Sequence, residues 1–169
     1  MPFSLSAKSL SFASHVDPRL LAVAKRAIAL STQDFGFTEE QSRTIEYEKK
    51  LVAEGKSHTL HSHHIIDCEP GWAKSGCSGA VDAVPYVTGK GYVWEWPLIY
   101  PVAAAFKKAS VELDTPITWG GVWDRLMTEY EGDDAAAMKA ADEAYVSRRR
   151  GAGQKHVFID GPHFELGRN

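Results

Sequence analysis

The sequence predicts an α+β fold in which a small antiparallel sheet is flanked by helices. Apolar residues recur at helical spacing in three or four separate segments. Short strand-like segments stand among them without the regular alternation of a parallel α/β protein. At 169 residues the chain is long enough to bury a real core, so we expect a single domain over residues 1–169.

Helices are expected where start signals meet apolar periodicity. The first covers about residues 18–31, because Asp17 is a suitable N-cap and Pro18 loses no hydrogen bond at the first helical position. A second is expected over residues 44–53 and a third over about 97–113.

Residues 124–153 differ in composition from the rest of the chain, and we expect them to form a helical insertion. They contain an alanine-rich stretch that ends in Arg148-Arg149-Arg150. Three arginines suit the negative end of a helix dipole, and we prefer that interpretation to contact with an anionic envelope.

Strands are expected at short apolar or alternating stretches bounded by turn residues. These are residues 35–37, 57–66, 80–87, 117–119 and 156–159. The last is expected to be a central strand that delivers Asp160.

Charge and hydropathy exclude several classes of function. The net charge of −3 gives no basic footprint for nucleic acid. We find neither a signal peptide nor an apolar run long enough to span a membrane, so we expect no stable membrane insertion. Two cysteines, Cys68 and Cys77, cannot build a four-cysteine zinc site, and they are either reduced thiols or a local bridge.

Four of the seven histidines lie between residues 58 and 64, and Asp82 follows within an apolar run. Histidine is the commonest metal ligand, and imidazole combined with carboxylate suits zinc. On a strand, neighbouring side chains point to opposite faces, so only one of His63 and His64 can enter a given site. The residues alone leave that choice open.

A second candidate piece lies near the C-terminus, where Asp160 and His163 are separated by Gly161-Pro162. A bend at this dipeptide can bring both side chains to one side. One would bind metal, and the other would handle the proton of the attacking water.

Three motifs carry a resemblance to a known family. They are Ser62-His63-His64, Gly79-Ala80-Val81-Asp82 and Asp160-Gly161-Pro162-His163-Phe164-Glu165-Leu166. Together they resemble the pattern of the phage L-alanyl-D-glutamate endopeptidases, which are endolysins related to D-alanyl-D-alanine dipeptidases and carboxypeptidases. The likeness also takes in Asp17-Pro18, residues 38–55, Trp94-Glu95-Trp96-Pro97 and residues 117–121, and so spans most of the chain.

The resemblance implies the D-alanyl-D-alanine carboxypeptidase/hedgehog-like zinc peptidase fold and a bound Zn²⁺. It implies three zinc ligands, which are His64, Asp82 and His163. Asp160 is then the general base, and Arg43 supports the oxyanion. Ser62 and His63 are expected at the substrate, with His63 where the family usually has arginine.

The distance of eighteen residues between His64 and Asp82 exceeds what is common in the family. We therefore expect an insertion loop at residues 66–79 that faces the substrate, which Cys68 and Cys77 would clip if they are bridged and not reduced. The lesser alternative gives a metal-binding role to Asp67, Cys68 or Glu69.

The expected function is that of a zinc endolysin, which hydrolyses the L-alanyl-D-glutamate bond of peptidoglycan stem peptides and lyses the bacterial host. Such a monomer would wait in the host cytoplasm until a holin releases it to the periplasm and cell wall. The alternatives are a D-alanyl-D-alanine carboxypeptidase or dipeptidase on the same scaffold and a non-catalytic cell-wall-binding module.

Overall fold

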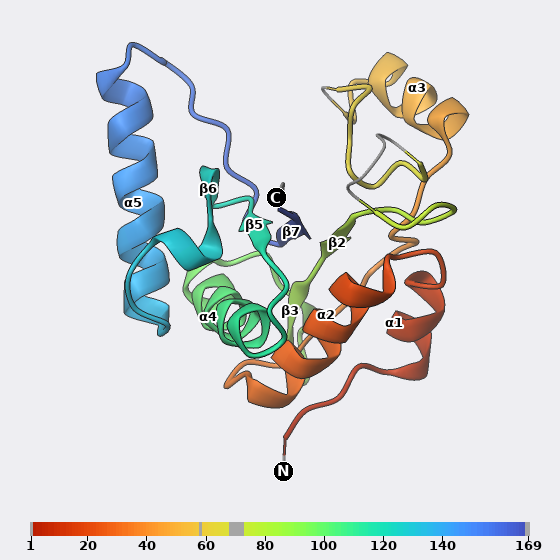
Figure 1. The fold of residues 1–169 in the computed structure, drawn as a ribbon, viewed down its shortest axis with the longest axis horizontal. Helices are drawn as coiled ribbons and strands as arrows, with labels where there is room; N and C mark the ends of the chain where they lie inside the picture. The colour runs from red at the N-terminus through yellow and green to blue at the C-terminus, as the bar shows by residue number, and fades with distance from the viewer. Residues whose placement is uncertain (1, 58, 68–72, 168–169) are drawn as a thin grey trace.

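The computed structural model describes residues 2–57, 59–67 and 73–167, and it confirms the α+β class (Figure 1). Its helices are α1 (Ala7–Phe12), α2 (Pro18–Leu30), α3 (Ile45–Ala53), α4 (Trp96–Glu112) and α5 (Ala135–Gly151), with a 3₁₀ turn at Met127–Glu129. Its strands are β1 (Phe35–Gly36), β2 (Ala80–Asp82), β3 (Val84–Val87), β4 (Gly91–Tyr92), β5 (Ile117–Trp119), β6 (Val122–Leu126) and β7 (His163–Leu166).

Two antiparallel sheets make up the β structure. The larger has the strand order β2-β7-β5-β6, and the smaller has the order β1-β3-β4. Helix α4 contacts α2, α5, β3 and β5. Figure 1 shows α5 and α3 on opposite sides of the molecule, with β2, β5 and β7 between them.

The helices predicted from start signals are confirmed. An oxygen of Asp17 accepts a hydrogen bond from the Arg19 amide at 2.9 Å, which caps α2 directly before Pro18. Helices α3 and α4 differ from their predicted ranges by one residue at their starts. Helix α1 was not predicted, although Ser6 caps it in the manner of a typical N-cap serine.

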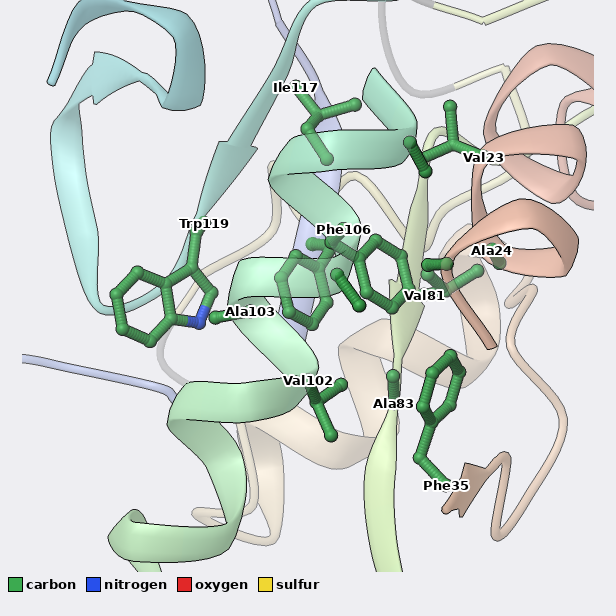
Figure 2. Close-up of a cluster of buried hydrophobic side chains, with 14 of the residues drawn as sticks. Val23, Ala24, Phe35, Val81, Ala83, Val102, Ala103, Phe106, Ile117 and Trp119 are labelled. Carbon is green, nitrogen blue, oxygen red and sulfur yellow. The ribbon is translucent and has the colours of Figure 1, made fainter. Parts of the chain in front are cut away.

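The core forms where α4 meets the larger sheet (Figure 2). The rings of Phe106 on α4 and Phe164 on β7 stack with centroids 3.8 Å apart and planes 8° apart. Val81 on β2 and Trp119 on β5, the two strands that flank β7, are also fully buried. Because side chains alternate along a strand, burying Phe164 turns its neighbours His163 and Glu165 to the opposite face of β7.

The strand predicted at residues 57–66 is wrong. The described part of this segment forms turns and irregular backbone, with a single bridge between Ile65 and Arg43. Hydroxyl groups at Thr59 and Ser62 bond to the amides of His61 and His64. Such local bonds compete with a strand ladder, which explains why the polar alternation does not form one.

The strand predicted at residues 156–159 is also wrong, because this segment is irregular. The strand that pairs with β5 and β2 is β7, which begins after Gly161-Pro162. Phe158 is largely exposed and stacks on Trp123 beside the cavity, while Val157 and Ile159 are half-buried against the core.

The two predicted insertions have different outcomes. The expected loop at residues 66–79 closes on itself where it is described, because Asp67 accepts a hydrogen bond from the Gly76 amide at 2.7 Å. The proposed Cys68–Cys77 bridge and any role of Glu69 lie outside the described residues. Within residues 124–153, the first residues belong to β6, and the helical part is α5, which packs on α4.

Candidate metal centre and catalytic site

Three side chains from distant parts of the chain converge on one point. Asp82 on β2 and His163 on β7 are direct cross-strand partners. The Asp82 Oδ1 lies 3.2 Å from His163 Nδ1 and 3.3 Å from His64 Nε2. The two ring nitrogens lie 3.3 Å apart.

This triangle has the dimensions of a metal site. Zinc binds imidazole nitrogen and carboxylate oxygen at roughly 2.0–2.1 Å, which for tetrahedral angles requires donor atoms about 3.3 Å apart. Each of the three residues offers one ligand atom, and these atoms all lie within 4.8 Å of one another. The chemistry and spacing of the three side chains therefore fit a metal ion such as zinc.

The structure brings His64, and not His63, into this group. The turn at residues 63–64, with Ser62 Oγ accepting from the His64 amide at 3.3 Å, orients the two imidazoles differently. His63 Nδ1 instead lies 3.2 Å from Glu165 Oε2. Asp67, a lesser candidate for metal binding, is engaged by Gly76 and stands outside the group.

Glu165 supports His163 from the side away from the metal position. Its Oε2 lies 3.0 Å from His163 Nε2, so that nitrogen donates its hydrogen to the carboxylate. The other ring nitrogen, Nδ1, is then the one available to a metal. Carboxylates commonly fix the tautomer of ligand histidines in this way.

The charges of the three clustered side chains influence one another strongly. Burial opposes a charge on His163, but the hydrogen bonds to Asp82 and Glu165 outweigh it and raise the pKa of His163 to about 10. Burial likewise opposes ionisation of Asp82, yet the charges and hydrogen bonds of His64 and His163 hold the Asp82 pKa well below its usual range. Binding of a metal ion would displace the proton from His163.

Asp160 lines the same cavity and is not one of the three clustered residues. Burial and the Asp82 carboxylate raise its pKa, against the opposing charges of His163, His64 and Arg43. A carboxylate with a raised pKa suits general-base chemistry. Gly120 holds its backbone, because the Gly120 oxygen accepts the Asp160 amide at 2.8 Å.

Gly120 has no room for a larger residue. A Cβ at this position would lie 2.2 Å from the Asp160 carbonyl oxygen. On the other side of the bend, the Trp119 indole donates to the Gly161 oxygen at 2.7 Å. Gly120, directly after β5, therefore allows the close approach that places Asp160.

Arg43 also lines the cavity, and a buried carboxylate holds it there. Glu48 is 0% exposed; its Oε2 lies 3.3 Å from Arg43 Nη1, and its Oε1 accepts from Ser57 Oγ at 2.5 Å. Sequence reasoning missed Glu48, since a glutamate on an amphipathic helix is ordinarily solvated. Its place one turn after the Thr44 cap was the available clue.

The cavity has a volume of ≈ 1090 Å³, large enough for a short peptide segment. Trp123 and Phe158 form an aromatic wall, with ring centroids 5.7 Å apart. Trp123 also lies against the His163 ring at 5.0 Å. Ser62 and His63 line the same space, so every predicted site residue borders it.

The fold and this site define a hydrolase with a candidate metal centre beside a free carboxylate. A family described as phage L-alanyl-D-glutamate peptidase matches residues 1–148. The chain therefore belongs to the phage L-alanyl-D-glutamate peptidases. The match ends before Asp160 and His163, which the pairing of β7 nevertheless brings to the site.

One sequence relative and one solved structure are similar to this chain. The L-alanyl-D-glutamate peptidase of Escherichia phage T5 is 28% identical over 124 residues, which are 73% of this chain and 84% of that protein. The crystal structure of the Serratia marcescens L-Ala D-Glu endopeptidase ChiX shares the fold, with a TM-score of 0.65 at 24% identity. That superposition covers 98% of this chain and 91% of the other.

Across the described ranges, no helix combines the length and the apolar character that crossing a bilayer requires.

Proposed function

We propose that this peptidase is a zinc enzyme that hydrolyses the L-alanyl-D-glutamate bond of peptidoglycan stem peptides. The observation that carries the proposal is the triangle of donor atoms from His64, Asp82 and His163, with sides of 3.2 to 3.3 Å. Family membership supports the bond that is cleaved.

Zinc held by these three side chains would polarise the scissile carbonyl and lower the pKa of a water in the open position. Asp160 accepts the proton of the attacking water and later returns it to the leaving amine. The Arg43 guanidinium donates hydrogen bonds to the carbonyl oxygen as negative charge develops there. Glu48 keeps the guanidinium aimed into the cavity.

Ser62 and His63 belong to the substrate side of this proposal because both border the cavity. Ser62 also braces the turn that carries His64. The aromatic wall of Trp123 and Phe158 offers an apolar surface to the methyl group of the alanyl residue.

The biological setting is proposed from family membership. The enzyme acts as a monomeric endolysin that stays in the host cytoplasm until a holin gives it access to the cell wall. Size-exclusion chromatography coupled to light scattering tests the monomer. Expression with and without a holin tests the route of release.

Digestion of purified peptidoglycan tests the bond that is cleaved. New amino termini on D-glutamate are expected, because hydrolysis after L-alanine frees that amine. Released D-alanine or its dipeptide would indicate the D-alanyl-D-alanine activity instead. Wall binding without any new amino terminus would indicate a binding module.

Metal removal tests the zinc separately. Dialysis against a chelator should abolish cleavage, and one equivalent of zinc should restore it. Full activity in protein shown by elemental analysis to contain no metal would exclude the zinc mechanism and leave the bond specificity standing.

A further inference from the structure

Gln41 lies in the loop between β1 and α3 and has no assigned role. Its side chain is polar, yet the residue is only 1% exposed. It lies against the Asp82 and His64 side of the candidate metal centre. A buried amide in such a place requires hydrogen-bond partners, and the bonds of Gln41 to Asp82, Glu39 and His64 are 2.6 to 2.7 Å long.

The side-chain amide of Gln41 binds the strand that carries Asp82. Gln41 Oε1 accepts a hydrogen bond from the Asp82 amide at 2.6 Å. Strand β2 is at the edge of its sheet, so β7 pairs with it on one side only. Gln41 supplies the acceptor that this peptide N–H needs.

The orientation of the Gln41 amide is fixed from both ends. Gln41 Nε2 donates to the Glu39 carbonyl oxygen at 2.7 Å. Because that carbonyl can only accept and the Asp82 amide can only donate, the flipped amide would lose both hydrogen bonds.

The backbone of Gln41 binds a second ligand. The Gln41 carbonyl oxygen lies 2.7 Å from His64 Nδ1. A carbonyl cannot donate, so Nδ1 carries the hydrogen and Nε2 presents its lone pair toward Asp82 and His163. The backbone N–H of Gln41 donates to the Phe12 carbonyl oxygen at 2.8 Å, which anchors the residue to the end of α1.

We propose that Gln41 is a positioning residue of the metal centre, which sets the distance between His64 and Asp82 by binding one through its backbone and the other through its side chain. The inference rests on the proposed zinc site and adds a residue to it. Gln41 is not a catalytic residue, since it does not line the cavity. Supporting groups of this kind typically change metal affinity by about 10- to 100-fold.

The test is the substitution Gln41→Met, which keeps length and volume but removes both side-chain hydrogen bonds. Gln33→Met is the matched control, because the Gln33 amide also donates to backbone oxygens, those of Asp34 and Tyr86, away from the centre. Gln41→Glu is a second variant that keeps the acceptor for the Asp82 amide.

Two readouts apply to each variant. The zinc dissociation constant is measured by competition with a chromophoric chelator, and we expect Gln41→Met to raise it at least about tenfold, with Gln33→Met unchanged. In the metal-free protein, hydrogen exchange of the Asp82 amide should be at least about tenfold faster in Gln41→Met. Gln41→Glu should fall between wild type and Gln41→Met in exchange.

Wild-type zinc affinity in a folded Gln41→Met protein would overturn the proposal, as would an equal loss in Gln33→Met. Should Gln41→Met fail to fold, Gln41→Asn decides, because its shorter side chain cannot reach the Asp82 amide, and wild-type exchange and zinc affinity in that variant would overturn the proposal. Failure of the proposed function has a different signature, because the wild-type protein itself would then bind no zinc.

Discussion

Oε2 of Glu48 lies 3.3 Å from Nη1 of Arg43, and the glutamate is fully buried while the arginine reaches the cavity. Two substitutions separate the roles of charge and shape in this pair. Arg43→Lys keeps a cation for Glu48 but loses the planar fork that an oxyanion requires. We expect kcat to fall by about 10²–10³ with a small change in thermal stability.

Glu48→Leu should act differently, because it leaves the Arg43 guanidinium with the looser 3.8 Å contact to the exposed Glu39 and removes the 2.5 Å acceptor of Ser57 Oγ. We expect a large loss of kcat and a change in the free energy of unfolding, measured by urea denaturation. Equal activity of Glu48→Leu and wild type would show that Arg43 does not need the Glu48 carboxylate to hold its position.

Removal of the carboxylate should change zinc content at Asp82 but not at Asp160. Asp82→Ala removes a donor from the metal triangle, so zinc content should fall below one equivalent. Asp160→Ala should retain zinc and fold while peptidoglycan cleavage collapses, because only the proton acceptor is lost. Elemental analysis and a turbidity assay measure both properties. Zinc retention by Asp82→Ala would remove that residue from the ligand set.

Glu165 is expected to act through His163. Glu165→Leu removes the acceptor at 3.0 Å from Nε2 and frees the imidazole to change tautomer, so the zinc dissociation constant should rise about 10- to 100-fold. Glu165→Gln is the matched variant, since its amide oxygen can still accept that hydrogen. A Gln variant as weak as the Leu variant would assign the effect to charge and not to the hydrogen bond.

Gly120 should tolerate no side chain. In Gly120→Ala the new methyl group meets the Asp160 carbonyl, 2.2 Å from the Cβ position, so the bend must shift. We expect destabilisation of about 1–3 kcal/mol together with a loss of activity larger than that of a remote variant of equal stability. Gly151→Ala is a suitable control, because a Cβ there meets nothing within 4 Å.

Asp17 should make stability depend on acid. Burial opposes its ionisation, but hydrogen bonds from Arg19 and Lys74 outweigh it, so the pKa of Asp17 lies below its ordinary 3.8. Because the unfolded chain protonates first, this stabilisation is present above pH 3.8 and is lost as the pH falls through the lower native pKa. Asp17→Asn should flatten urea-measured stability in this acidic range. An unchanged pH profile would contradict the shift.

Local signals account for what the sequence predicted well. Asp17-Pro18 marks a helix start through chemistry confined to neighbouring residues, and the apolar period of α4 reports its buried face. The strand expected at residues 156–159 does not form, because strand pairing depends on contacts between segments that are far apart in the sequence. The edge of β5 accepts residues 163–166 instead, and no property of the short apolar run reveals that choice.

The candidate ligands could be found from the sequence because they stand in motifs, whereas their supports could not. Gln41, Glu48 and Glu165 are buried or half-buried polar residues, and local sequence does not show what they bind. Gln41 binds Asp82, 41 positions away, whereas Glu48 and Glu165 bind Arg43 and His163, five and two positions away, through the way the chain folds around the cavity. A lone polar residue in a sequence is ordinarily solvated, so only tertiary contacts distinguish these three.

Strand β7 couples the interior of the protein to its chemistry. Phe164 and Leu166 point into the core, while His163 and Glu165 point into the cavity. A slip of one residue in its pairing would exchange the two faces, moving an imidazole into the core and an aromatic ring into the cavity. Close packing of Phe164 against Phe106 therefore fixes the register that aligns the candidate metal ligands, and mutations that repack these two rings should lower activity before they unfold the protein.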